Sequence, residues 1–138
     1  MESTRDPLTA AVIGAAIEVH RVLGPGLFET VYDECLCWEL RHRSLAVRRQ
    51  ARVPVVYKDN ALDASYRIDL LVEKRLVVEV KAVERVLPVH DAQVLTYMRM
   101  SGASVGLLLN FNTPVLKDGI KRFVNTRGGA RREKGQIE

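Results

Sequence analysis

The segment 66–82 constrains the fold more than any other part of the chain, because apolar side chains alternate at both of its ends. In its first seven and its last seven residues they occupy every second position. A period of two residues is typical of β-strands, so the segment predicts two neighbouring strands joined by a tight turn at 73–75. Asp69, Glu79 and Lys81 place charge within these strands. Charged groups in apolar strands are unfavourable unless they are paired or take part in chemistry, so these three residues need an explanation.

A helix is predicted at the start of the chain. Asp6 can cap the free amides of a first turn, and Pro7 suits the first helical position. Apolar residues then recur at helical spacing as far as Leu23. The Gly-Pro-Gly sequence at 24–26 ends this helix, and a second helix is predicted over 27–43.

Glu29 and Tyr32 are expected on one side of the second helix, because they are three residues apart. Glu29 also stands in the first turn, where a carboxylate interacts favourably with the helix dipole. That interaction alone would explain an isolated Glu. Glu29 is therefore open to a structural as well as a functional interpretation.

The rest of the chain predicts three more strands and one more helix. The strand before the central pair contains Pro54, which suggests an edge or an irregular position. The helix contains Gln93 and Tyr97, which are four residues apart and therefore lie one turn above each other. A nearly continuous apolar run after this helix is typical of a strand covered on both faces. In chain order these elements are expected at 47–57, 89–100 (the helix), 105–110 and 120–124.

This order of elements predicts an α/β fold, in which a mixed central β-sheet is flanked by α-helices and two N-terminal helices lead the chain. A length of 138 residues favours one domain. We expect this domain to span residues 1–125. The glycine- and arginine-rich residues 126–138 are expected to form a flexible basic tail.

Composition narrows the functional classes only slightly. The net charge of +4 permits an anionic partner such as nucleic acid, although so mild an excess is weak support. Cys35 and Cys37 are too few to complete a four-cysteine metal site, so we expect both to be reduced. The N-terminal segment carries no secretory cleavage signal, and no apolar run is long enough to span a bilayer. We therefore expect a cytoplasmic protein without a membrane partner.

Asp69 and Glu79, on neighbouring predicted strands, indicate a site for a divalent cation. Mg²⁺ prefers oxygen ligands, and Mn²⁺ accepts the same ligands. The backbone carbonyl of Val80 can supply a third oxygen beside the two carboxylates. Lys81 would then orient or help to deprotonate an attacking water, or offset negative charge on a phosphate in its transition state.

Two other interpretations use the same three charged residues. They could form a cross-strand salt bridge on an exposed sheet face, or a buried structural network without catalysis. Gln93 and Tyr97 favour the catalytic interpretation, because the helix that carries them follows directly and both could face the same site. Glu29 and Tyr32 offer a further carboxylate and a phenol from the N-terminal half.

The heptad at 26–32, Gly-Leu-Phe-Glu-Thr-Val-Tyr, resembles the signature of the GxxExxY proteins, a bacterial group within the PD-(D/E)xK nuclease-like superfamily. The resemblance extends from about Leu8 to Asn125, with the motifs in the expected order. Further segments that resemble the family are 20–26, 69–72, 79–84, 110–112 and 116–122.

This resemblance implies a restriction-endonuclease-like core. The helix with Gln93 and Tyr97 is similar to the Q-x-x-x-Y helix of the RecB and lambda-exonuclease branch, in which these residues brace the site or touch the substrate backbone. The implied metal ligands are Asp69, Glu79, Val80 and Glu29. The implied catalytic residues are Asp69, Glu79, Lys81, Gln93, Tyr97 and Glu29. His20 is a further candidate, because an upstream His ligates metal in some members of that branch.

The implied activity is hydrolysis of phosphodiester bonds in DNA with Mg²⁺ or Mn²⁺ as cofactor, in the setting of DNA repair or defence. The alternative is a non-catalytic module that binds nucleic acid or a protein partner through basic residues such as Arg48, Arg49 and Arg52. The chain is short for a nuclease that must grip a long duplex alone, so a homodimer or a partner protein is also expected.

Overall fold

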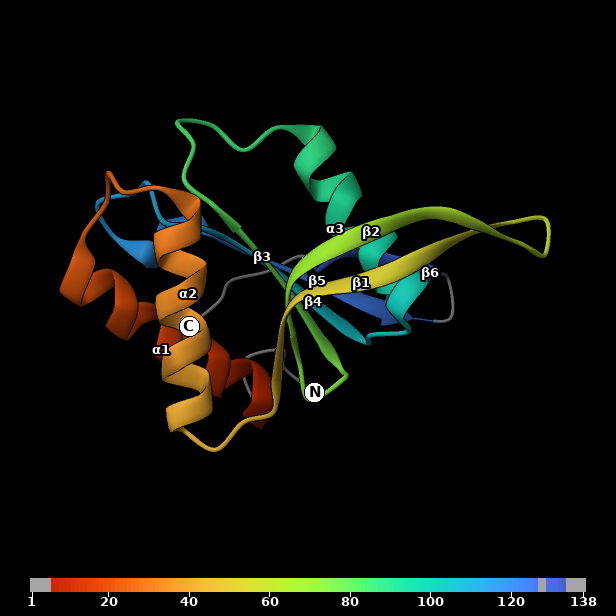
Figure 1. Cartoon of the computed structure of the whole chain (residues 1–138). Coiled ribbons are helices and arrows are strands. Elements are labelled where there is room, and N and C mark those ends of the chain that lie inside the picture. Colours follow the sequence, from red (N-terminus) through yellow and green to blue (C-terminus); the bar gives the residue numbers. More distant parts are fainter. Residues whose placement is uncertain (1–5, 127–128, 134–138) are drawn as a thin grey trace.

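The structure is a computed structural model that describes residues 6–126 and 129–133 (Figure 1). Two helices lead the chain, and strands and one further helix follow them. The elements are α1 (Pro7–Leu23), α2 (Glu29–His42), β1 (Val47–Tyr57), β2 (Asn60–Val72), β3 (Leu76–Lys81), α3 (Pro88–Ser101), β4 (Val105–Asn110), the 3-10 helix η2 (Leu116–Gly119), β5 (Ile120–Thr126) and β6 (Gly129–Arg132).

The strands form one sheet in the order β1-β2-β3-β4-β5-β6. β3 and β4 run parallel, and the other neighbouring pairs are antiparallel. A parallel pair needs a crossover, which α3 supplies between β3 and β4. In Figure 1, α1 and α2 lie on one side of the sheet and α3 lies on the other. The expected mixed sheet flanked by helices is confirmed.

Each face of the sheet buries its own apolar cluster. On the α1–α2 side, Tyr32 and Phe111 stack with ring centroids 4.5 Å apart. On the α3 side, Val94 and Met98 pack against strand residues that include Val77. Side chains alternate between the faces along a strand, so Glu79 and Lys81 share the α3 side with Val77. The two charged residues therefore stand on the face that α3 covers.

The first helix begins as its sequence predicts. The Asp6 carboxylate accepts hydrogen bonds from the amide of Leu8 (3.3 Å) and the hydroxyl of Thr9 (2.6 Å), and Pro7 occupies the first turn. Within the residues that the structure describes, no helix is long and apolar enough to cross a membrane.

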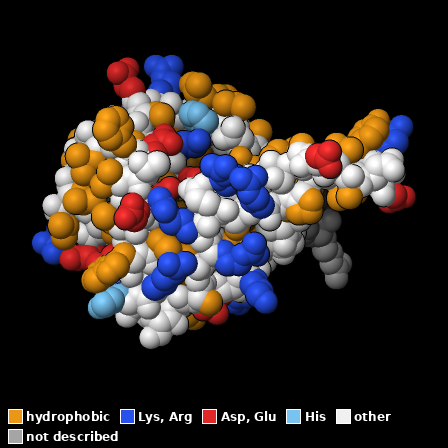
Figure 2. Space-filling model, viewed as in Figure 1, with side chains coloured by type: hydrophobic (Ala, Val, Ile, Leu, Met, Phe, Trp, Pro, Cys, Tyr) orange, Lys and Arg blue, Asp and Glu red, His pale blue; other side chains and the backbone are white. Residues whose placement is uncertain are grey.

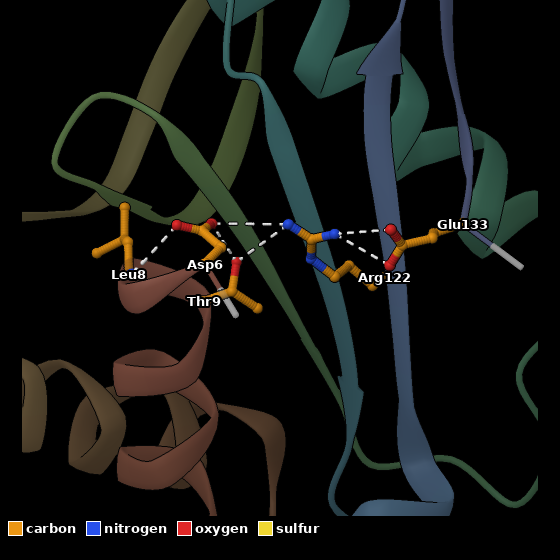
Figure 3. Close-up of polar contacts among 5 residues, drawn as sticks. All are labelled: Asp6, Leu8, Thr9, Arg122 and Glu133. Carbon is orange, nitrogen blue, oxygen red and sulfur yellow. Dashed lines mark hydrogen bonds and ion pairs between the residues drawn. The ribbon is translucent and has the colours of Figure 1, made fainter. Parts of the chain in front are cut away.

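A buried arginine ties this helix start to the C-terminal strands (Figure 3). Arg122 is 6% exposed, and its Nη1 donates to both carboxylate oxygens of Glu133 at 3.0 Å. Its Nη2 lies 3.6 Å from Oδ2 of Asp6 and donates to Oγ1 of Thr9 at 3.4 Å. The network therefore links α1, β5 and the residue that follows β6.

The C-terminal part differs from the expectation of a flexible tail over 126–138. β5 extends to Thr126, and 129–132 form β6, which pairs antiparallel with β5. The sequence after Thr126 gave no strand signal, and the ion pair of Glu133 with Arg122 joins residues that are 11 positions apart in the sequence. Residues 127–128 and 134–138 lie outside the described part, so that part of the expectation is untested.

β1 and β2 form a longer hairpin than expected, and it projects well beyond the sheet (Figure 1). β2 begins at Asn60, before the alternating apolar residues start. Most side chains from Pro54 to Ser65 are exposed. The pairing register shifts between Pro54 and Val56, on the edge strand of the sheet, as the proline predicted.

Candidate active site

β2 and β3 separate at the carboxylates of Asp69 and Glu79. The last paired residues are Leu70 and Val78, and the next positions are joined by side chains. The amide of Asp69 donates to Oε2 of Glu79 at 3.0 Å, and the amide of Val80 donates to Oδ2 of Asp69 at 2.8 Å. Each carboxylate thus takes the place of a backbone acceptor. These bonds fix both acids at the point where β2 and β3 separate, and we call this point, with Asp69 and Glu79, the fork.

Both acids of the fork are held in surroundings that oppose their ionisation. Glu79 is only 4% exposed, and burial followed by the charge of Asp69 raises its pKa from 4.5 to about 8. Burial also raises the pKa of Asp69, against the opposing effect of the hydrogen bond from Val80. Two neighbouring buried carboxylates cannot both ionise freely. The fork is therefore a place where a positive charge would be stabilised.

Lys81 is the nearest basic residue along β3 and is half-buried. Its charge lowers the pKa of Asp69 and of Glu79, although burial outweighs it in both. Across residues 6–126 and 129–133, its ammonium has no carboxylate within 4.0 Å. The described residues therefore show no cross-strand salt bridge on an exposed face, which was one alternative interpretation of these three residues.

Glu29 reaches the fork from the first residue of α2. Its Oε2 accepts a hydrogen bond from the amide of Ala82 at 3.1 Å, directly after the end of β3. Its negative charge contributes to the raised pKa of both Asp69 and Glu79. The structure thus brings the acid of the 26–32 heptad to the same end of β3 as the two strand carboxylates.

Asp33 is a fourth acid beside the fork, and it was not among the residues that sequence reasoning selected. Its Oδ1 accepts from Nη2 (2.7 Å) and Nε (2.9 Å) of Arg49, and its Oδ2 accepts from Nε2 of Gln50 at 3.3 Å. Burial is the main cause that raises its pKa, and its charge raises the pKa of Asp69. Its position four residues after Glu29, on one helix face, was the signal that could have identified it.

Tyr97 approaches the fork from α3. Burial, and then the charges of Glu79 and Asp69, raise its pKa, and its ring lies 5.6 Å from that of Tyr66. Gln93 is half-buried one turn earlier on α3. No hydrogen bond of the Gln93 side chain occurs within the described ranges. The structure therefore brings Tyr97 next to the carboxylates and places Gln93 on the same helix nearby.

Tyr32 and His20 are engaged elsewhere. The Tyr32 hydroxyl donates to the carbonyl of Gly24 at 2.6 Å and accepts from the amide of Leu27 at 3.1 Å, so it holds the Gly-Pro-Gly loop. The ring of Tyr32 is fully buried, and its hydroxyl bonds to this loop rather than to the fork. Nε2 of His20 donates to the carbonyl of Thr113 at 2.8 Å, on the α1 side of the sheet. The ring nitrogen that makes this bond is not free to bind metal.

The donor set at the fork fits a hard cation that keeps part of its water shell. No group of three or more His, Cys, Asp or Glu side chains converges as a metal site in the part of the chain that the structure describes. Mg²⁺ is nevertheless commonly held by one or two carboxylates, with waters and substrate phosphate as its other ligands. Asp69 and Glu79 meet this requirement, and a cation would relieve the repulsion that raises their pKa values.

Comparison with known proteins gives one match. The profile described as PD-(D/E)XK nuclease superfamily matches residues 6–123, which include all the residues of the fork, of α2 and of α3 discussed above. No curated protein and no solved structure matches the chain.

Proposed function

Because the chain belongs to the PD-(D/E)XK nuclease superfamily, we propose that it is a metal-dependent nuclease that hydrolyses phosphodiester bonds of DNA. The observation that carries this proposal is the pair of carboxylates at the β2–β3 fork, each of which accepts a hydrogen bond from a backbone amide of the other strand, with Lys81 two residues after Glu79 on β3. Buried acids with raised pKa values beside a lysine are more typical of a reactive site than of a solvated surface.

Asp69 and Glu79 would hold Mg²⁺ or Mn²⁺. When bound, such an ion polarises the phosphate and lowers the pKa of a bound water. The chain contributes the fixed positions of the acids, because both are hydrogen-bonded to backbone amides and neither can turn away without breaking a bond. The carbonyl of Val80 remains the third proposed ligand.

Lys81 supplies the positive charge that the reaction needs near the phosphate. Its ammonium is not bound to a carboxylate within the described ranges, so it is available to orient the attacking water or to offset charge on the phosphate. Glu29 is proposed to help bind metal from the end of α2. Tyr97, with Gln93, is proposed to brace the carboxylates or contact the substrate backbone.

Four finer assignments are proposed from the sequence alone. The heptad at 26–32 favours the GxxExxY group, and the Q-x-x-x-Y helix favours the RecB and lambda-exonuclease branch. DNA repair or defence is the proposed setting, and a homodimer or a partner protein would extend the short chain along its substrate.

Replacement of Lys81 by Met tests the proposal, because it removes the charge and keeps most of the volume. We expect the Lys81→Met protein to fold normally and to cut DNA at least about 100-fold more slowly in Mg²⁺, as is common for a group that acts on the reacting atoms. Lys74→Met, in the exposed turn before β3, is the matched control and should cut at the parental rate.

The opposite result identifies the alternatives. Equal cleavage by the Lys81→Met protein and the parent would contradict the catalytic role of Lys81 and support a structural network. DNA binding that persists in EDTA, without product from the parent or either variant, would support the non-catalytic binding module.

A further inference from the structure

The β1–β2 hairpin carries a projecting segment, residues 52–67, that we call the arm. It extends away from the sheet and from the three helices (Figure 1). Most of its side chains are exposed, so the described part of the chain does not cover it. Figure 2 shows Lys and Arg side chains gathered where this hairpin leaves the body of the molecule.

One face of the hairpin is already occupied at the base of the arm. Ala51 and Ile68 are buried in the cluster beneath α3, Val53 packs against that cluster, and the ring of Tyr66 lies 5.6 Å from that of Tyr97. Strand side chains alternate between faces, so residues 52 and 67 point away from α3. The burial of the inner face therefore determines that residues 52 and 67 lie on the outer face of the arm base.

Arg52 and Arg67 stand directly opposite each other on this outer face. The antiparallel register pairs the two residues, and both side chains are exposed. Like charges at directly opposed positions destabilise a strand pair. The arrangement therefore works against the stability of the hairpin unless an anion lies between the two guanidinium groups.

No such anion comes from the described residues. Arg52 donates a single hydrogen bond, to Oγ of Ser65 at 3.3 Å. Neither arginine has a carboxylate within 4.0 Å in residues 6–126 or 129–133. Arg49 is different, because Asp33 holds its guanidinium at 2.7 Å. Two neighbouring, unoccupied guanidinium groups form a site suited to phosphate, which arginine binds through two parallel hydrogen bonds.

This site lies close to the proposed reaction centre. Arg67 is two residues before Asp69 on β2, which corresponds to about 7 Å along a strand, although its side chain points away from α3 and those of Glu79 and Lys81 lie on the α3 face. We propose that Arg52 and Arg67 bind backbone phosphates of duplex DNA outside the site of cleavage, and that the arm lies along the duplex. The inference rests on the proposed nuclease function and names the substrate form that the site would take.

The shape of the arm favours duplex DNA over other polyanions. A two-stranded ribbon fits the major groove of B-DNA, which is about 12 Å wide. The major groove of an RNA duplex is too narrow for side chains to read. A single strand would be expected to bind through stacking on aromatic side chains, and the outer face at the arm base presents charge instead.

Binding of a 25-base-pair DNA duplex in EDTA tests the inference without any need for cleavage. Each phosphate contact contributes about 0.9 to the slope of log affinity against log salt, which is roughly 8-fold in affinity at 0.1 M salt. We expect Arg52→Gln/Arg67→Gln to lower the slope by about 1.8 and to weaken binding roughly 60-fold. Lys74→Gln/Arg75→Gln, which removes the same charge at the other end of β2, should leave the slope unchanged.

A second variant guards against a simple folding defect. Arg52→Glu places a carboxylate opposite Arg67, so it should form a cross-strand ion pair, raise the unfolding midpoint and abolish duplex binding. Parental binding by Arg52→Glu would overturn the inference. So would equal loss in the Lys74→Gln/Arg75→Gln protein, since that result would reflect net charge alone.

Competing ligands give further outcomes that count against the inference. If the Arg52→Gln/Arg67→Gln protein loses binding to single-stranded DNA or duplex RNA but retains binding to duplex DNA, the assignment to duplex DNA is overturned. If the Arg52→Gln/Arg67→Gln protein loses self-association in sedimentation while its DNA binding is unchanged, the arm is a protein interface and the inference is overturned. Failure of the nuclease proposal can be distinguished from failure of this inference. Parental protein that binds duplex DNA through the arginine pair without cutting it would support duplex binding by the arm and contradict the nuclease activity.

Discussion

Replacement of Glu79 by Gln should stabilise the metal-free protein at alkaline pH. The carboxylate of Glu79 is buried next to Asp69, and its pKa is raised from 4.5 to about 8. Gln has nearly the same shape and keeps an oxygen that can accept the hydrogen bond from the amide of Asp69. The substitution therefore removes the charge repulsion and retains the bond between the strands.

The direction with pH follows from the raised pKa. The folded state binds the proton of Glu79 more tightly than the unfolded state does, so this group favours folding fully below about pH 4.5. That contribution is lost as the pH rises through about 8. A tenfold change in proton affinity is worth about 1.4 kcal/mol, so the full loss is about 5 kcal/mol at most.

Urea unfolding in EDTA at pH 5 and pH 9 measures the effect. We expect Glu79→Gln to exceed the parent by several kcal/mol at pH 9 and by little at pH 5. Glu84→Gln, at an exposed position after β3, should match the parent at both pH values. Replacing EDTA by Mg²⁺ at pH 9 should stabilise the parent and leave the Glu79→Gln protein unchanged. A stability difference that is the same at both pH values would refute the reasoning.

Three further substitutions test contacts that hold other parts of the fold together, each by urea unfolding. Arg122→Ala should lose about 3 kcal/mol, because it leaves the carboxylates of a partly buried network unpaired. Tyr32→Phe should lose about 1–2 kcal/mol through the hydroxyl that binds Gly24 and Leu27. Gly106→Ala should lose about 1–3 kcal/mol, because the new methyl group would lie 2.7 Å from the sulfur of Met98. A parental midpoint in any of these would contradict the corresponding contact.

The strand pair and its charges could be predicted because the pattern is local. Alternation over 66–82 places Glu79 and Lys81 on one face whatever the rest of the chain does. The start of α1 was equally local, since the cap and the proline are adjacent in sequence. The side-chain bonds that close the fork need the tertiary register of β2 against β3, which alternation does not specify.

Other features depend on contacts between distant residues or on exposed strands. The first half of β2 is exposed on most positions, so no apolar period marked it. β6 has only four residues, Gly-Ala-Arg-Arg, and the ion pair of Glu133 with Arg122 carries no local signal. The partners of Asp33 come from β1, 16 and 17 residues away, so sequence spacing could place this acid near Glu29 but could not show its bonds to Arg49 and Gln50.

The most direct test of the central claim is Mn²⁺ titration by calorimetry into the parent and Asp69→Asn, followed by a DNA cleavage assay on the same samples. We predict that the parent binds metal and cuts DNA, and that both properties vanish together in Asp69→Asn. Cleavage by Asp69→Asn at the parental rate, or no metal binding by the parent, would contradict a nuclease centred on the β2–β3 fork.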